Sequence, residues 1–294
     1  MIARELSGHL AMMCFAALVA GSFSFGALIG DQLSPLVVTA FRFVLTAALL
    51  GALAWPAVRR GDWSFQTPWR YVVLGASPAL YFMLMFEALK TAAPVSLAVL
   101  FTLTPLVTGM FGYVLLGQNV SRRVLLALLI GGLGAVWVIF RGDLAQLLAF
   151  HIGRGELIFL IGMVCYALYA PLVRKLKRDE PQVVFTFAIT LGALLVTLPF
   201  ALRDLVVTEY RAVPMQVWLV VGYLAVFASA ATFSLIQLAT LRLPSVKVMA
   251  HTYLIPSWVI VWQLVLGRGA PLATEMIGVV MTVIALGVLL KSQE

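Results

Sequence analysis

Long apolar runs separated by short polar linkers make up most of the chain. Ten of these runs hold about 20 mostly apolar residues each, the length with which a helix crosses the hydrocarbon core of a bilayer. They cover approximately residues 10–30, 36–56, 69–89, 94–116, 122–140, 155–173, 182–202, 214–239, 245–267 and 273–290. The pattern predicts an all-α integral membrane protein with ten transmembrane helices, whose first run is a retained span and not a cleaved signal peptide.

The composition agrees with lipid as the main solvent. Hydrophobic residues make up 63% of the 294 residues and charged residues only 11%, against about 25% charged residues in soluble domains. The net charge of +8 comes from short Lys and Arg clusters between apolar runs. Such clusters are typical of loops at anionic headgroups and not of a groove that binds nucleic acid. Cys14 and Cys165 lie inside apolar runs, so we expect no disulfide, metal site or other cofactor.

The distribution of basic residues predicts the orientation. With the N-terminus in the cytoplasm, twelve Lys and Arg residues fall on the inner side of the membrane and six on the outer side. Because basic residues concentrate in cytoplasmic loops, we expect both chain ends in the cytoplasm. The expected location is the plasma membrane, which in a bacterium is the inner membrane.

The two halves of the chain match each other at an offset of 151 residues. The offset aligns several short segments: "MMCFA" (12–16) with "MVCYA" (163–167), Phe82 with Phe233, and "LTP" (103–105) with "LIP" (254–256). We therefore predict two repeats, 1–145 with the first five spans and 154–294 with the last five. An odd number of spans per repeat makes the second repeat enter from the opposite face, and such inverted repeats are common in secondary transporters.

Each repeat carries a proline in the middle of its fourth span, Pro105 and Pro256. Proline lacks a backbone donor and so frees the carbonyl four residues earlier, here that of Phe101 or Thr252. In a membrane, irregular backbone is tolerated only where it is buried in protein or lines a cavity. We expect these prolines to act as hinges for alternating access and the freed carbonyls to face a solute.

Several of these features together resemble a known family. The chain has an arginine early in the second span (Arg42), the segment "AAPVSLAVLFTLTP" (92–105), prolines in spans 4 and 9, and the glycine-rich "IGGLGAVWVI" (130–139). Over nearly its whole length it resembles the ten-helix EamA-type exporters of the drug/metabolite transporter superfamily. The resemblance implies a secondary transporter that exports small metabolites by alternating access.

One departure from the family pattern narrows the expected substrate. The family usually ends span 4 with Gly-Glu, whereas this chain has Gly117-Gln118, and the second half has Gly267-Arg268. Gly-Gln at this place is similar to the YddG-type amino-acid exporters. By this resemblance the expected substrates are amino acids, aromatic ones included.

The resembled exporters have their transport cavity among spans 1, 3, 4, 6, 8 and 9. Polar and aromatic residues on these spans are our candidate substrate-binding residues: Tyr81, Thr102, Thr104, Tyr166, Tyr169, Gln237, His251 and Trp258. Rings stack on the apolar part of an amphipathic solute, and hydroxyl groups bind its polar part. Tyr166, Thr102 and Thr104 match cavity positions of those exporters, although aromatic residues are expected in place of the two threonines. Alternatively, the threonines bond to their own helix backbone.

Charged residues inside spans are candidates for function by default. Arg42 lies about two turns from the outer surface, where it can pair with Glu87 or Asp31, bind a carboxylate, or extend toward headgroups; a pair with Glu87 is the expected gating contact. No Asp or Glu occupies the middle third of any span. Because proton-coupled carriers usually hold such a group, we expect transport down the solute's own gradient.

Other functions fit the sequence less well. An intramembrane enzyme needs a nucleophile–base pair or a metal cluster, and His9, His151 and His251 stand far apart, outside any such motif. A channel would need a charge ring or a filter loop. A drug or quaternary-ammonium exporter is the main alternative, although it favours an acid near the site. We expect a small-molecule transporter in the lipid bilayer, monomeric or weakly homo-oligomeric.

Overall fold

The protein is all-helical over the residues that the computed structural model describes, which are 2–61, 67–118, 122–139, 152–268 and 273–291. Eight helical segments are long and apolar enough to cross a membrane. They are Glu5–Ile29, Pro35–Arg59, Trp69–Ala88, Pro94–Leu116, Arg154–Leu176, Gln182–Val207, Met215–Thr240 and Lys247–Val265. The expected all-α integral membrane architecture is therefore confirmed, with eight of the predicted spans.

The two remaining predicted spans coincide with helices of marginal apolar length. Helix α6 (Arg122–Ile139) covers the fifth predicted span and α15 (Ala273–Lys291) the tenth. Their apolar stretches among the described residues are shorter than the other eight, Leu125–Gly134 and Val279–Val288. A total of ten spans therefore stays a prediction.

The other spans divide into continuous and interrupted helices. The continuous ones are α1 (Ile2–Ile29), α2 (Pro35–Arg59), α3 (Trp69–Ala88) and α10 (Gln182–Val207). The interrupted ones are α4 (Pro94–Phe101) with α5 (Thr104–Leu116), α8 (Arg154–Ala167) with α9 (Tyr169–Leu176), α11 (Met215–Ala225) with η2 (Val226–Ala231) and α12 (Thr232–Thr240), and α13 (Ser245–Ala250) with η3 (His251–Leu254) and α14 (Ile255–Val265).

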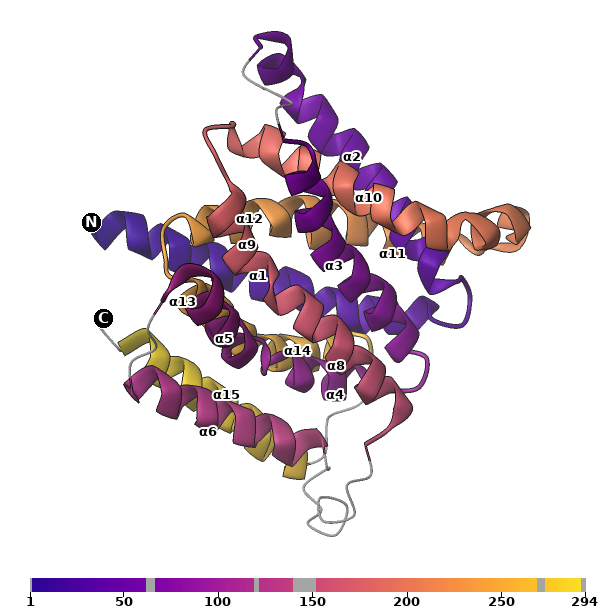
Figure 1. The fold of residues 1–294 in the computed structure, drawn as a ribbon. Coiled ribbons are helices and arrows are strands. Elements are labelled where there is room, and N and C mark those ends of the chain that lie inside the picture. Colours follow the sequence, from indigo (N-terminus) through magenta and orange to yellow (C-terminus); the bar gives the residue numbers. More distant parts are fainter. Residues whose placement is uncertain (1, 62–66, 119–121, 140–151, 269–272, 292–294) are drawn as a thin grey trace.

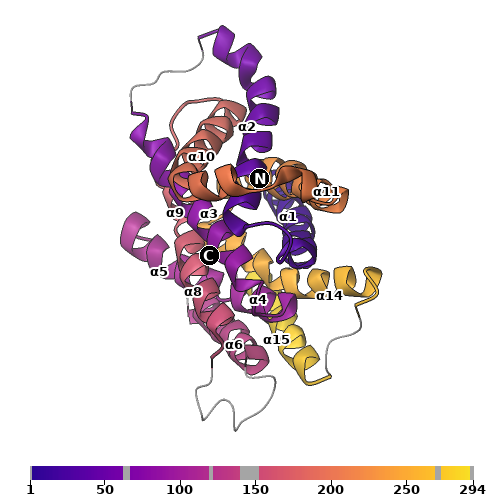
Figure 2. The same ribbon diagram turned by 90° about the vertical axis from the view of Figure 1, so that its right-hand side faces the viewer.

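The helices pack as one bundle in which neighbours in space are often distant in sequence. Helix α10 lies against α2 and α3, α3 against α8, and α1 against α12 and α14, while α5 contacts α13. Helices α6 and α15 run side by side along one flank of the bundle, as both views show (Figures 1 and 2). The start of α1 and the end of α15 lie on the same side of the molecule (Figure 1).

Two glycines bring α3 and α10 into backbone contact. A Cβ atom added to Gly75 would lie 2.6 Å from the carbonyl oxygen of Ile189, and one added to Gly192 would lie 2.6 Å from the carbonyl carbon of Tyr71. Small residues permit such close approach between membrane helices. Any larger side chain at either position would push the two helices apart.

Two helix breaks lie next to the prolines for which the sequence predicted them. Helix α4 ends at Phe101 just before Pro105, and the Phe101 carbonyl that this proline frees accepts a bond from Thr104 Oγ1 at 2.5 Å. In the second half, the Thr252 carbonyl freed by Pro256 accepts the backbone N–H of Ile255. The breaks lie where we expected them, but both carbonyls already have donors within the chain. The expectation that they face a solute is therefore not supported.

A third proline break was not expected from the sequence. Pro171 leaves the carbonyl of Ala167 without its helical donor, and the helix is interrupted between α8 and α9 at Leu168. The hydroxyl of Thr108, on α5, donates to this carbonyl at 3.0 Å. A side chain from the neighbouring span thus repairs the break, as buried backbone in a membrane requires.

Candidate functional site

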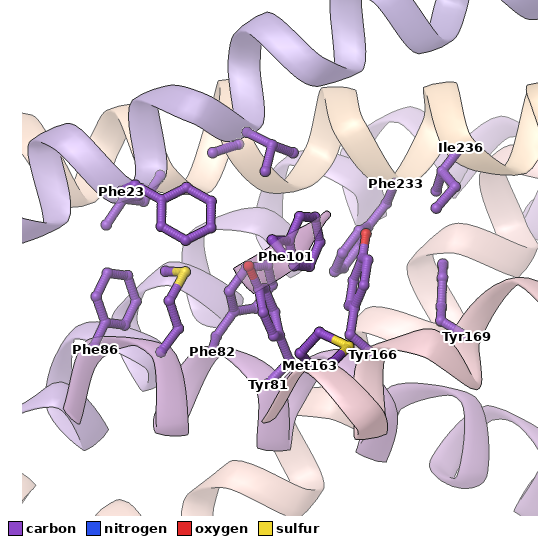
Figure 3. Close-up of a cluster of buried hydrophobic side chains, with 14 of the residues drawn as sticks. Phe23, Tyr81, Phe82, Phe86, Phe101, Met163, Tyr166, Tyr169, Phe233 and Ile236 are labelled. Carbon is purple, nitrogen blue, oxygen red and sulfur yellow. The ribbon is translucent and has the colours of Figure 1, made fainter. Parts of the chain in front are cut away.

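Aromatic rings from six helices meet at the centre of the bundle. This central aromatic cluster consists of Phe23, Tyr81, Phe82, Phe101, Phe159, Tyr166, Tyr169 and Phe233, contributed by α1, α3, α4, α8, α9 and α12. The ring centroid of Tyr81 lies 4.7 Å from that of Tyr166 and 5.3 Å from that of Phe101. Figure 3 shows the Tyr81 and Tyr166 rings side by side, with their hydroxyl groups pointing to the same side. The cluster thus gathers three of the predicted binding residues, Tyr81, Tyr166 and Tyr169.

Arg42 is the buried cation beside this cluster. Its side chain is completely buried, and its guanidinium carbon lies 3.5 Å from the centroid of the Phe82 ring. Nε donates to Ser229 Oγ and Nη2 to the carbonyl oxygen of Ala228, whereas Nη1 has no hydrogen-bond partner. The described residues place no carboxylate within 4.0 Å of this guanidinium.

The π-helical turn of η2 explains why Arg42 lies where it does. A π-turn widens the helix and is frequent at functional sites. Besides Arg42, Thr46 of α2 donates from Oγ1 to the carbonyl oxygen of Ala225, at 2.9 Å, where the π-turn begins. Two side chains of α2 therefore bind the irregular backbone of the span-8 helix. This arrangement links the two halves of the chain in the interior of the bundle.

The predicted ion pair between Arg42 and Glu87 is not present. Glu87 instead accepts a bond from Lys90 at 2.8 Å, and both side chains are more than one-third exposed. Asp31, the other candidate, lines a polar pocket of about 370 Å³ with Lys90 at the end of the bundle where α1 ends. The reason is geometric: the Arg42 side chain binds η2, whereas Glu87 lies in the last turn of α3 and Asp31 just after the end of α1.

Gln237 extends the polar lining of the cluster. Its Nε2 donates to Tyr169 Oη at 3.4 Å, and its Oε1 accepts from Thr186 Oγ1 at 2.6 Å. Gln237 is completely buried. The structure therefore brings Gln237 into contact with Tyr169, another of the predicted binding residues.

The remaining predicted residues lie outside this group or have their polar atoms occupied. Thr102 Oγ1 donates to the Val99 carbonyl oxygen at 2.6 Å, and Thr104 is bonded to Phe101 as described above, so the backbone alternative applies to both. Trp258 is 40% exposed and shares its helix face with Val261 and Val265, which are also exposed. This face is typical of lipid contact, so Trp258 is separated from the cluster.

His251 contacts another histidine near the start of α1. The Nε2 atom of His251 lies 3.3 Å from Nδ1 of His9, and its Nδ1 lies 3.0 Å from the carbonyl oxygen of Lys247. His251 is buried and His9 is half-buried. This pair joins α1 to η3 and is not part of the central aromatic cluster. His151 lies outside the described residues.

A polar network joins helices and linkers at the end of the bundle where α1 begins. Arg70 and Glu180 form a buried ion pair at 2.6 Å, and the hydroxyl of Tyr71 donates to the same carboxylate oxygen at 2.8 Å. Burial alone would raise the pKa of Glu180, but hydrogen bonds from the backbone, Tyr71 and Arg70 outweigh it and hold this pKa below its ordinary value. At the same end, Arg242 donates to Ser7 Oγ.

A smaller contact joins helices at the other end. Ser34, before α2, donates to the carboxylate of Asp204 near the end of α10. The central aromatic cluster therefore lies between two sets of polar contacts. Sequence reasoning missed both sets, because each joins residues more than 100 positions apart.

The chemistry of the site suits the binding of a small molecule. The described part of the chain holds no group of three or more His, Cys, Asp or Glu side chains that could bind a metal. The site provides aromatic faces, one buried cation with a free donor, and hydroxyl groups. Such a set binds the ring and the polar part of a small organic molecule.

Comparisons with known proteins give the family. The sequence model described as the EamA-like transporter family matches twice, at residues 6–140 and 153–291. The uncharacterized transporter YyaM of Bacillus subtilis (strain 168) is 27% identical over 77% of this chain and 75% of its own length. An uncharacterized transporter of Archaeoglobus fulgidus is 23% identical over 84% of this chain and 85% of its own.

A solved crystal structure has a similar fold. It matches with a TM-score of 0.72 over 97% of this chain and 96% of its own, at 21% identity, which shows similarity of fold alone. These matches do not support the narrower YddG-type assignment. Because the family consists of transporters, the enzyme alternative is excluded. The chain belongs to the EamA-like transporter family.

Proposed function

We propose that the chain is a secondary transporter that exports small amphipathic metabolites, above all amino acids with aromatic ones included. The observation that carries the proposal is the central aromatic cluster with the buried Arg42 beside it. A stack of rings favours the apolar side chain of a solute, and a buried cation without a carboxylate partner favours an anionic group. An amino acid carries both.

The proposed architecture is a pair of inverted five-helix repeats, 1–145 and 154–294, with α6 and α15 as the fifth and tenth spans. Support comes from the way in which the helices pair. The contact of α1 with α12 has its counterpart in that of α8 with α3, and the contact of α2 with α11 in that of α10 with α3. The contact of α5 with α13 likewise has its counterpart in that of α14 with α4, and the equivalent helices α2 and α10, and α6 and α15, contact each other. A twofold relation between the halves would produce these pairings.

During alternating access, the polar contacts at one end of the bundle would break while those at the other end form. Opening toward one side requires separation of α3 from the α9–α10 linker, and opening toward the other requires separation of α2 from the end of α10. Pro105 and Pro256 interrupt their helices between these ends. We assign them the role of hinges, since a break without regular helical bonds bends at low cost.

We further propose that transport is not coupled to protons and that both chain ends are cytoplasmic. The described acidic side chains lie in linkers or near helix ends, away from the central aromatic cluster. The start of α1 and the end of α15 on one side of the molecule (Figure 1) fit an even number of spans. Basic residues in the loops favour the cytoplasm for that side.

A drug or quaternary-ammonium exporter is the second candidate, because aromatic rings also bind organic cations. Arg42 argues against it. The Arg42 guanidinium, 3.5 Å from the centroid of the Phe82 ring, occupies one aromatic face and its positive charge repels a second cation nearby.

Exchange of radiolabelled solutes by the purified protein in liposomes tests the proposal. Amino acids should exchange, and Tyr166→Ala should lower the rate about tenfold through lost ring contacts. Trp258→Ala, on the lipid-facing side, serves as the control and should retain the rate. Exchange of cationic dyes without any amino acid would reject the substrate class. Accumulation against a gradient when a proton gradient is imposed would refute uncoupled transport.

A further inference from the structure

We propose that Arg42 and Tyr81 together bind the carboxylate of the transported solute, and that the site selects for this carboxylate and not for an ammonium group. The inference rests on the proposed transport function and names its substrate class more narrowly. The proposed substrate class includes organic acids that have a ring or chain but no amino group.

The bonds of Arg42 leave one defined part of the guanidinium available. Nε and Nη2 form one edge of the planar group, and both are bonded to η2 through Ser229 and Ala228. These two bonds, together with the Phe82 ring against its face, fix the orientation of the plane. Nη1, on the opposite side of the group from that edge, is buried and has no partner. A fixed and unpaired donor of a buried cation is a prepared site for an anion.

Tyr81 supplies a second unpaired donor beside the same ring. Its side chain is 1% exposed and its hydroxyl has no hydrogen-bond partner. The Tyr81 ring centroid is 4.9 Å from that of Phe82, the ring that Arg42 covers. Buried polar atoms are almost always paired. Two unpaired donors on side chains that pack against the same ring therefore point to a ligand.

The chemistry of the two donors determines the ligand. Nη1 can only donate, and the hydroxyl can also donate. Their common partner is a group that accepts from both and carries the negative charge that Arg42 lacks nearby, which describes a carboxylate with its two oxygens. The rings of Phe101 and Tyr166, which contact Tyr81, would receive the organic part of the solute.

The described residues at this site offer no carboxylate to pair with an amino group. The described residues of the central aromatic cluster include no acid, and the nearby Arg42 disfavours a second positive charge. The amino group of an amino acid therefore contributes little to binding at this site, and its removal should leave recognition intact.

Four related probes separate these contributions: phenylalanine, 3-phenylpropionate, phenylalaninamide and phenethylamine. The first two carry the carboxylate and the last two lack it. Each is tested for stabilisation of the detergent-purified protein in thermal unfolding, and for inhibition of labelled phenylalanine exchange in liposomes. We expect phenylalanine and 3-phenylpropionate to act at similar concentrations, and the other two to require concentrations at least about tenfold higher, as for loss of a charge-assisted hydrogen bond.

Variants assign the effect to the two side chains. Tyr81→Phe removes only the hydroxyl and should raise the effective concentration of both carboxylates about tenfold. Tyr253→Phe is the matched control, because Tyr253 is also buried with an unpartnered hydroxyl but packs against Gly131 of α6; it should behave as wild type. Arg42→Lys, which keeps the charge and loses the fixed fork, should weaken carboxylate binding as well.

The outcomes distinguish this inference from the transport function. If neither carboxylate stabilises the wild-type protein, or if phenethylamine acts as well as 3-phenylpropionate, the carboxylate site is refuted, whether or not exchange occurs. An unchanged response of Tyr81→Phe refutes it too. If both carboxylates stabilise the protein while no solute exchanges, the site stands and the transport function fails.

Discussion

Glu180→Gln should weaken the bundle at the end where α3 meets the linker between α9 and α10. Glu180 accepts bonds at Oε1 from Arg70 Nη2 (2.6 Å) and Tyr71 Oη (2.8 Å), and at Oε2 from the backbone N–H of Arg178 (2.9 Å). Glutamine keeps an acceptor for the first two bonds. It loses the charge, and its amide nitrogen then opposes the Arg178 N–H, donor against donor.

The expected magnitude follows from burial. The side chains of Arg70 and Glu180 are only 3% and 7% exposed, so the substitution leaves a buried guanidinium without its counter-charge. Removing one partner of a buried ion pair costs roughly 3–5 kcal/mol. Because glutamine retains one acceptor, we expect the lower end, about 3 kcal/mol of unfolding free energy, which corresponds to a melting temperature lower by about 6–12 °C.

Thermal unfolding of the detergent-purified variant at neutral pH, followed by intrinsic tryptophan fluorescence, measures the change. Glu87→Gln is the matched control, because Glu87 also pairs with a basic residue at 2.8 Å but with both side chains more than one-third exposed. Exposed pairs contribute little, so this variant should unfold close to wild type. Equal melting temperatures for the two variants would show that the cost of burying Arg70 and Glu180 cancels their attraction.

Three further predictions concern acid stability, the hinges and the contact of α3 with α10. The pKa of Glu180 is lowered in the folded protein, so the stability that this carboxylate contributes is complete above its ordinary pKa of 4.5 and is lost as pH falls through the lowered pKa. The difference in melting temperature between wild type and Glu180→Gln should therefore shrink below pH 4.5. A constant difference down to about pH 3 would contradict this. Pro105→Ala and Pro256→Ala should each slow solute exchange while circular dichroism and melting stay close to wild type, and unchanged rates in both would exclude the hinge role. Gly75→Ala should cost about 1–3 kcal/mol of stability through overpacking, measured by thermal unfolding against Gly222→Ala, whose added Cβ meets no atom within 4 Å.

Helix positions and two of the four interruptions in the described spans could be predicted because their causes are local. A run of about 20 apolar residues spans a bilayer wherever it stands in the chain, and eight such runs are helices of that length. Pro105 and Pro256 mark breaks because a missing donor acts on the residue four positions earlier. Pro171 follows the same rule, whereas Pro78 and Pro199 lie inside continuous helices, so a proline alone does not predict a break.

The membership of the site was predictable only in part. Tyr81, Tyr166, Tyr169 and Gln237 are polar or aromatic residues on spans of the expected cavity, and the structure brings them together in pairs. Trp258 satisfies the same description and faces outward. Helical periodicity shows which residues share a face, but not which neighbour that face meets.

What the sequence by itself determined is therefore the membrane class, the place of the helices and the family resemblance, since these depend on local composition and spacing. Only the tertiary structure decided the partner of Arg42. The sequence allowed Glu87, Asp31, headgroups or a solute, whereas the side chain binds the π-turn of η2 and retains one free donor. Val226–Ala231 contains neither proline nor glycine to signal that turn. The turn and its contact with α2 arise from packing between helices that lie more than 180 residues apart, which no local pattern encodes.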